Sequence, residues 1–74
     1  MIYEDLIKRV GWGEEFSFYY QDNRYWISSN NDGYYLTREK DSFSQSFHTS
    51  KELFDLGEIE GKSFKEVWNV IDIL

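Results

Sequence analysis

The chain has 74 residues and carries 14 acidic against eight basic side chains, for a formal net charge of −6. Six Phe, six Tyr and three Trp supply much of its apolar mass, and it has no cysteine. These totals exclude disulfide bonds and thiolate metal sites, and an acidic chain without a basic stripe is not expected to bind a nucleic-acid backbone directly. A chain of this length predicts one small domain, residues 1–74, with an aromatic core.

The N-terminal residues do not have the pattern of a secretory signal. Glu4 and Asp5 come early, and no apolar run reaches the length of a signal-peptide core or a membrane span. The single histidine, His48, leaves no histidine-rich metal site. We therefore expect a cytoplasmic protein with no cofactor, no metal and no membrane partner.

The first elements are a helix and a strand. Apolar residues recur at helical spacing over residues 2–10, with the acids before the bases, and Gly11 is expected to end this helix. Residues 15–21 alternate, which predicts a strand. A two-residue turn at 22–23 would pair residue 20 with 25, 18 with 27, 16 with 29, and Tyr19 with Trp26. One face then carries the apolar residues Phe16, Phe18, Tyr20, Tyr25 and Ile27.

The tetrad at 30–33, Asn-Asn-Asp-Gly, predicts a second hairpin. As a four-residue loop with Gly33 in the left-handed conformation, it pairs residue 29 with 34, 28 with 35, 27 with 36 and 25 with 38. This register places Leu36 on the apolar face, whereas a three-residue loop would turn it away. The hydrophobic pattern therefore favours a three-stranded antiparallel meander over residues 15–39.

The C-terminal half predicts an edge strand and two helices. Residues 43–49 alternate and are a candidate fourth strand. Thr49 and Ser63 are each followed three residues later by Glu, which matches the capping box at a helix start. The first helix covers residues 50–56, and the tail after the second continues as helix or ends extended. The predicted fold is α+β: an N-terminal helix, a three- or four-stranded antiparallel meander, and two short C-terminal helices on one sheet face.

The residues with catalytic potential do not form a recognisable catalytic constellation. Catalysis needs a positioned nucleophile or acid–base pair, and His48 is interpreted as a surface residue of a strand or loop. The Asp/Asn turns lack the spacing of a calcium loop. The carboxylate pairs 14/15 and 58/60 are interpreted as solvated charge, because so short a chain rarely forms the pocket that paired acids need. We expect no enzymatic activity.

The candidate functional surface is the second sheet face. If helices cover the apolar face, then Tyr19, Trp26 and Tyr35 lie together opposite, with Arg24 beside them, and these residue types are enriched at binding hot spots. The alternative is that the rings only stabilise a bare sheet. An acidic segment would steer docking to a basic surface on another protein, or would serve solubility alone. Its residues are Glu52, Asp55, Glu58 and Glu60.

Two segments carry a resemblance to known proteins: EEFSFYYQDNRYWISSNNDGYYLTRE and FHTSKELFDLGEIEGKSFKEVWNVIDIL. Together they resemble short, acidic, uncharacterised proteins of low-GC Gram-positive bacteria, their phages and mobile elements, over roughly residues 14–73. The resemblance rests on strand, turn and helix patterns and implies a small mixed domain.

Small acidic proteins of this origin are often inhibitors, such as immunity proteins and anti-restriction or anti-CRISPR factors. By analogy, we expect a non-enzymatic protein-binding module that inhibits by occupying a partner's surface. Two alternatives stay open. One is a nucleic-acid mimic that blocks a basic groove, and the other is a structural protein that forms a homodimer.

Overall fold

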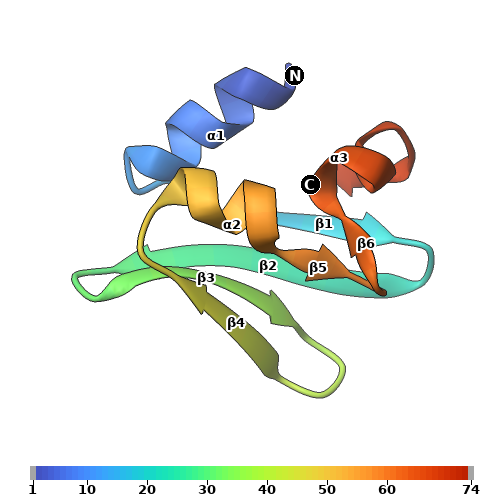
Figure 1. The fold of residues 1–74 in the computed structure, drawn as a ribbon. Coiled ribbons are helices and arrows are strands. Elements are labelled where there is room, and N and C mark those ends of the chain that lie inside the picture. Colours follow the sequence, from blue (N-terminus) through green and yellow to red (C-terminus); the bar gives the residue numbers. More distant parts are fainter. Residues whose placement is uncertain (1, 74) are drawn as a thin grey trace.

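The computed structural model describes residues 2–73 and confirms the α+β class, with the helices on one side of a curved antiparallel sheet (Figure 1). The helices are α1 (Tyr3–Gly11), α2 (Ser50–Leu56), α3 (Phe64–Val67) and the 3-10 turn η1 (Trp68–Val70). The strands are β1 (Phe16–Tyr20), β2 (Asn23–Asn30), β3 (Gly33–Arg38), β4 (Phe43–Phe47), β5 (Glu58–Ile59), β6 (Lys62–Ser63) and β7 (Asp72–Ile73).

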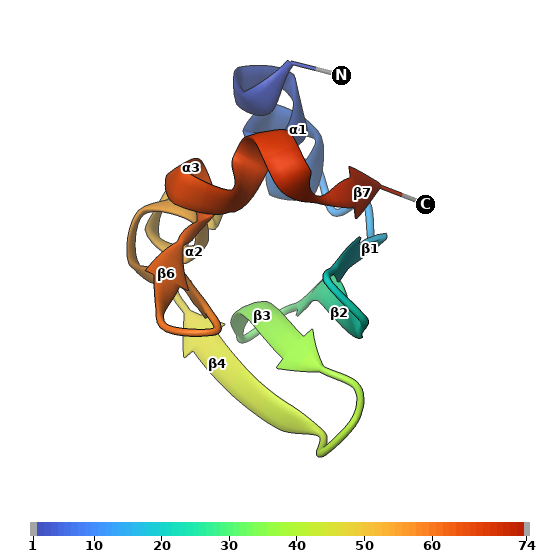
Figure 2. The same ribbon diagram turned by 90° about the vertical axis from the view of Figure 1, so that its right-hand side faces the viewer.

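The main sheet has five strands in the order β4-β3-β2-β1-β7. The candidate strand at 43–49 is confirmed as the edge strand β4, and the tail ends as an extended segment. That segment, β7, pairs antiparallel with β1, with Ile73 opposite Phe18 (Figure 2). The last strand of the chain therefore adds a fifth strand beside the first one.

The two predicted hairpin registers have different outcomes. The β2–β3 register is confirmed, with Ile27 opposite Leu36, but the predicted four-residue loop is wrong, because Asn30 pairs with Gly33 and the turn lies at 31–32. The β1–β2 register is wrong by two residues, because Phe18 opposes Tyr25 and the turn lies at 21–22. This register stacks the rings of Phe18 and Tyr25, with centroids 5.4 Å apart and an interplanar angle of 6°. A slip of two residues leaves every side chain on its predicted face.

The predicted caps explain where the later helices begin. At α3, the Ser63 hydroxyl accepts from the Glu66 N–H at 3.2 Å and the Glu66 carboxylate accepts from the Ser63 N–H at 3.0 Å, which completes the capping box. At α2, Thr49 caps the Glu52 N–H, but the Glu52 carboxylate accepts from the His48 N–H instead. Helix α1 includes Gly11, which was expected to end it.

The hydrophobic core lies between the sheet and the helices. It is built from the predicted apolar sheet face and from residues of α1, α2, β5 and α3. Its buried members are Leu6, Val10, Phe18, Tyr20, Tyr25, Ile27, Leu36, Leu53, Phe54, Ile59, Phe64 and Val67. The sheet therefore uses one face for the core and leaves the other free of helices.

The β5–β6 hairpin was not predicted from the sequence. Its two-residue turn places Glu60 at φ 52° and Gly61 at φ 79°, the left-handed pair that matches the twist of a tight hairpin. The Glu-Gly dipeptide was a weak signal for this turn. The hairpin carries Ile59 into the core and holds Glu60 over the end of the sheet.

Candidate functional surface

The open face of the sheet is the face of β1–β4 away from the helices (Figure 1). The predicted aromatic residues lie on this face, because they alternate along the strands with the buried residues of the core. Trp26 is 42% exposed and Tyr19 is 38% exposed, while Tyr35 is half-buried. The structure therefore leaves these rings in contact with solvent. They lie on three neighbouring strands, because β2 pairs with both β1 and β3.

The cross-strand register decides the neighbours of each ring on the open face. Trp26 lies between Ser17 on β1 and Thr37 on β3. Tyr19 opposes Arg24, so the predicted direct pairing of Tyr19 with Trp26 is wrong. The physical reason is the two-residue slip of the first hairpin, which makes these two rings diagonal neighbours. Short hydroxyl side chains therefore flank the indole on both sides.

The other predicted residues of the open face have partners of their own. The Arg24 guanidinium donates to the Ser17 hydroxyl at 3.3 Å and forms an ion pair with Glu39 at 2.7 Å. The Tyr35 hydroxyl donates to the Asn30 side chain at 3.1 Å. These contacts orient Arg24 and Tyr35 along the surface, where Arg24 is exposed and Tyr35 is half-buried.

The predicted acidic segment lies on α2 and the β5–β6 hairpin, across the sheet from the open face (Figure 1). Asp55 forms an ion pair with Lys51 at 2.7 Å, and the Glu52 carboxylate accepts from the His48 N–H at 3.3 Å. Glu60 contacts Tyr25 and Arg38. The eight predicted partner-binding residues therefore form two separate groups, and most of the acids already interact with groups of the chain itself.

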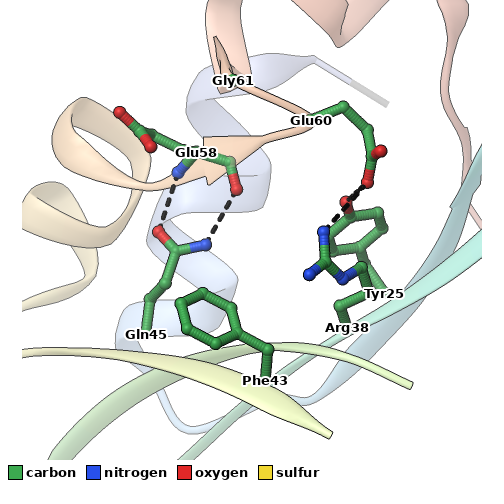
Figure 3. Close-up of a pocket in the computed structure, with 7 residues that line it drawn as sticks. All are labelled: Tyr25, Arg38, Phe43, Gln45, Glu58, Glu60 and Gly61. Carbon is green, nitrogen blue, oxygen red and sulfur yellow. Dashed lines mark hydrogen bonds and ion pairs between the residues drawn. The ribbon is translucent and has the colours of Figure 1, made fainter. Parts of the chain in front are cut away.

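A pocket of about 200 Å³ opens between the β3–β4 end of the sheet and the β5–β6 hairpin (Figure 3). Inside it, the Tyr25 hydroxyl donates to the Glu60 carboxylate, and Arg38 donates to Glu60 at 3.4 Å. Arg38 also donates to Asp41, next to the pocket, at 2.7 and 3.1 Å. The lining residues are Tyr25, Arg38, Phe43, Gln45, Glu58, Glu60 and Gly61.

The contacts in this pocket shift the pKa values of its acids. Burial, and then the hydrogen bond to Glu60, raise the pKa of the Tyr25 phenol to about 12. The Arg38 hydrogen bonds lower the pKa of Asp41 to about 2. The Tyr25 hydrogen bond, followed by Arg38, lowers the pKa of the Glu60 carboxyl. At neutral pH this set of interacting groups therefore contains the Arg38 cation, the Asp41 and Glu60 carboxylates and the neutral Tyr25 phenol.

This set joins the β5–β6 hairpin to the sheet. Arg38 is shared between two carboxylates, and its guanidinium also lies 5.7 Å from the centroid of the Phe43 ring. Sequence reasoning missed the set, because Tyr25 and Glu60 are 35 residues apart and Arg38 carries no local motif.

Further properties of the described residues bear on ligands and membranes. Within residues 2–73, there is no group of three or more His, Cys, Asp or Glu side chains that could hold a metal ion. No helix of this part of the chain has the length and apolar character needed to cross a membrane.

Comparison of the chain with protein-family models, curated proteins and solved structures gives no match. The resemblance to short acidic proteins of mobile elements therefore stays a prediction.

Proposed function

We propose that the protein is a non-enzymatic binding module that docks on another protein through the open face of its sheet. The observation that carries this proposal is the position of Trp26. Its indole is 42% exposed at the middle of a sheet whose other face is occupied by the core. The packing of the core therefore does not explain an exposed indole at this position. Docking on a partner would bury the ring.

The surroundings of Trp26 support this role. Ser17 and Thr37 are too short to cover the indole from the sides, so a partner can reach the ring from above. Tyr19 and Arg24 lie at the rim, where hydroxyl and guanidinium groups form hydrogen bonds as water is excluded. A central Trp within a polar rim is the arrangement in which single interface residues contribute most.

The resemblance to mobile-element proteins supports an inhibitory role for such docking. A module of this size inhibits by occupying a surface that its target needs, with no chemistry of its own. The alternative of nucleic-acid mimicry has less support, because Asp55 and Glu60 form ion pairs with Lys51 and Arg38 of the same chain. Acids paired in this way offer less free charge to a basic groove.

The experiment compares two exposed tryptophans. The wild-type chain is used to capture partners from a lysate of a low-GC Gram-positive bacterium, and affinity for the captured protein is then measured by calorimetry. Trp26→Ala is expected to weaken binding by more than about 2 kcal/mol. Trp12→Ala is the matched control, because Trp12 is 74% exposed at the end of α1, beside Asp5, Lys8 and Arg9, and it is expected to leave the affinity unchanged.

The thermal stability of both variants separates binding from folding. We expect Trp26→Ala to shift the melting temperature little, since the ring contributes to the outside of the sheet. Unfolding of Trp26→Ala would show that the indole is needed for the stability of the fold. Equal losses of affinity in the two variants would place the docking surface elsewhere.

A further inference from the structure

Strand β4 has an edge that no other strand covers among residues 2–73. The backbone groups on this edge can be identified from the neighbouring ladder. The Glu39 N–H donates to the Arg24 carbonyl oxygen at 3.0 Å, so residues 24 and 39 form a hydrogen-bonded pair between β2 and β3. Hydrogen-bonded pairs recur at every second residue of an antiparallel ladder, so Leu36 directs its N–H and C=O toward β4.

The same alternation then applies to β4. Gln45 opposes Leu36 and directs its backbone groups toward β3, as do Phe43 and Phe47. The backbone groups of Ser44 and Ser46 point away from the sheet. Two N–H donors and two C=O acceptors are therefore presented along one open edge.

This edge lacks the features that usually prevent pairing with another strand. Natural edges are shortened, bulged, or protected by Lys and Pro. Strand β4 has the sequence FSQSF, without charge or proline, and pairs with β3 residue by residue over its full length. Within residues 2–73, the opposite edge strand, β7, covers Asp72–Ile73. Strand β4 is thus the longer and less protected of the two edges.

The sequence of β4 indicates which strand fits beside it. Phe-Ser-Gln-Ser-Phe reads the same in both directions, and its centre is Gln45. Antiparallel pairing with a second copy about this centre opposes Phe43 to Phe47 and Ser44 to Ser46. A two-fold axis through Gln45 makes this register isologous, and the palindrome makes each opposed pair alike, Phe with Phe and Ser with Ser. It also brings no like charges together, because β4 is neutral.

We propose that β4 is a homodimerisation edge, at which two copies pair antiparallel about Gln45 and join their sheets. Ser44 of each copy opposes Ser46 of the other, and each of these two pairs exchanges two backbone hydrogen bonds, which gives four in all. Phe43, which is 56% exposed in the single chain, gains a ring partner in Phe47 of the second copy.

The proposed dimer does not depend on the proposed function, but it would extend the same surface. The two-fold axis is perpendicular to the joined sheet, so both open faces point the same way and present two copies of Trp26. Pairing through one strand buries less than a standard interface, and each copy carries a net charge of −6. The dimer is therefore weak, and added salt strengthens it by screening the repulsion.

The test is sedimentation of the full chain from micromolar to millimolar concentration. We expect the sedimenting mass to double over this range, with the midpoint at lower concentration in high salt. The double variant Ser44→Lys/Ser46→Lys places Lys opposite Lys at both serine pairs and is expected to weaken dimerisation roughly tenfold or more. This loss would occur although the variant lowers the net negative charge of each copy.

The matched control is Ser44→Lys/Ser46→Glu, which places Lys opposite Glu in the same register. We expect this variant to dimerise at least as well as the wild type, with circular dichroism confirming that both variants fold. A wild-type chain that stays monomeric at every concentration would overturn the proposal. A dimer that persists equally in both variants would also overturn it, because the two chains would then meet elsewhere.

Discussion

The side-chain amide of Gln45 forms two hydrogen bonds with the backbone of Glu58. It donates to the Glu58 carbonyl oxygen at 2.8 Å and accepts from the Glu58 N–H at 2.9 Å (Figure 3). The amide thus takes the place of a neighbouring peptide group along β5. Together with the contacts of Glu60 to Tyr25 and Arg38, it holds the β5–β6 hairpin against the sheet.

Replacement of Gln45 by Met keeps the length of the side chain and removes both hydrogen bonds. We expect a loss of about 1–2 kcal/mol in the free energy of unfolding, because both hydrogen bonds between the half-buried Gln45 and the Glu58 backbone are lost. Urea titration measures this loss, and hydrogen exchange should show faster exchange of the Glu58 amide. Ser46→Ala, on the same strand but on the open face, is the control and should stay within about 0.5 kcal/mol of the wild type.

Tyr25→Phe removes only the hydroxyl that donates to Glu60. The expected loss is about 1–3 kcal/mol, since this hydrogen bond has a charged acceptor and the ring is buried. Tyr20→Phe is the matched control, because Tyr20 is also buried and its hydroxyl has no hydrogen bond to the described residues. A larger loss for Tyr20→Phe than for Tyr25→Phe would contradict the assigned role of the Glu60 contact.

The lowered pKa of Asp41 predicts a dependence of stability on pH. A carboxylate with a depressed folded-state pKa stabilises the fold fully above the ordinary pKa of Asp, about 4. This contribution is lost as the pH falls through about 2, where folded Asp41 takes up its proton. Asp41→Asn should therefore be less stable than the wild type at neutral pH, and the difference should shrink toward zero near pH 2.

Glu15→Gln controls for the loss of one negative charge in this pH series. Both variants and the wild type are unfolded with urea at each pH. The prediction fails if the Asp41→Asn difference is independent of pH, because the ion pair with Arg38 would then contribute nothing.

Gly57 is required by packing rather than by its backbone angles. Its φ of −64° and ψ of 144° suit any residue, but an added Cβ would meet the Leu53 carbonyl oxygen and lie 3.2 Å from a Leu36 methyl. Gly57→Ala is therefore expected to destabilise the fold by about 1–3 kcal/mol in urea titration. Leu56→Ala is the neighbouring control. Leu56 is exposed, so its replacement should change the stability by about 0.5 kcal/mol or less.

The alternation of side chains was enough to assign the two faces of the sheet. The buried set on β1–β3 and the exposed position of Trp26 both follow from a period of two residues. The same pattern could not determine the β1–β2 register, because a slip of two residues leaves each face unchanged. Only the tertiary structure decided it, in favour of Phe18 opposite Tyr25.

Local chemistry also predicted where α2 and α3 begin, because a capping residue and its Glu are three positions apart and interact within one turn. Contacts between distant segments carry no such local signal. The pairing of β7 with β1 and the contact of Glu60 with Tyr25 each depend on how the whole chain closes around its core. By itself, the sequence therefore determined which side chains face inward and where the later helices start. The tertiary structure alone decided which distant segments meet, because those contacts form only once the core brings them together.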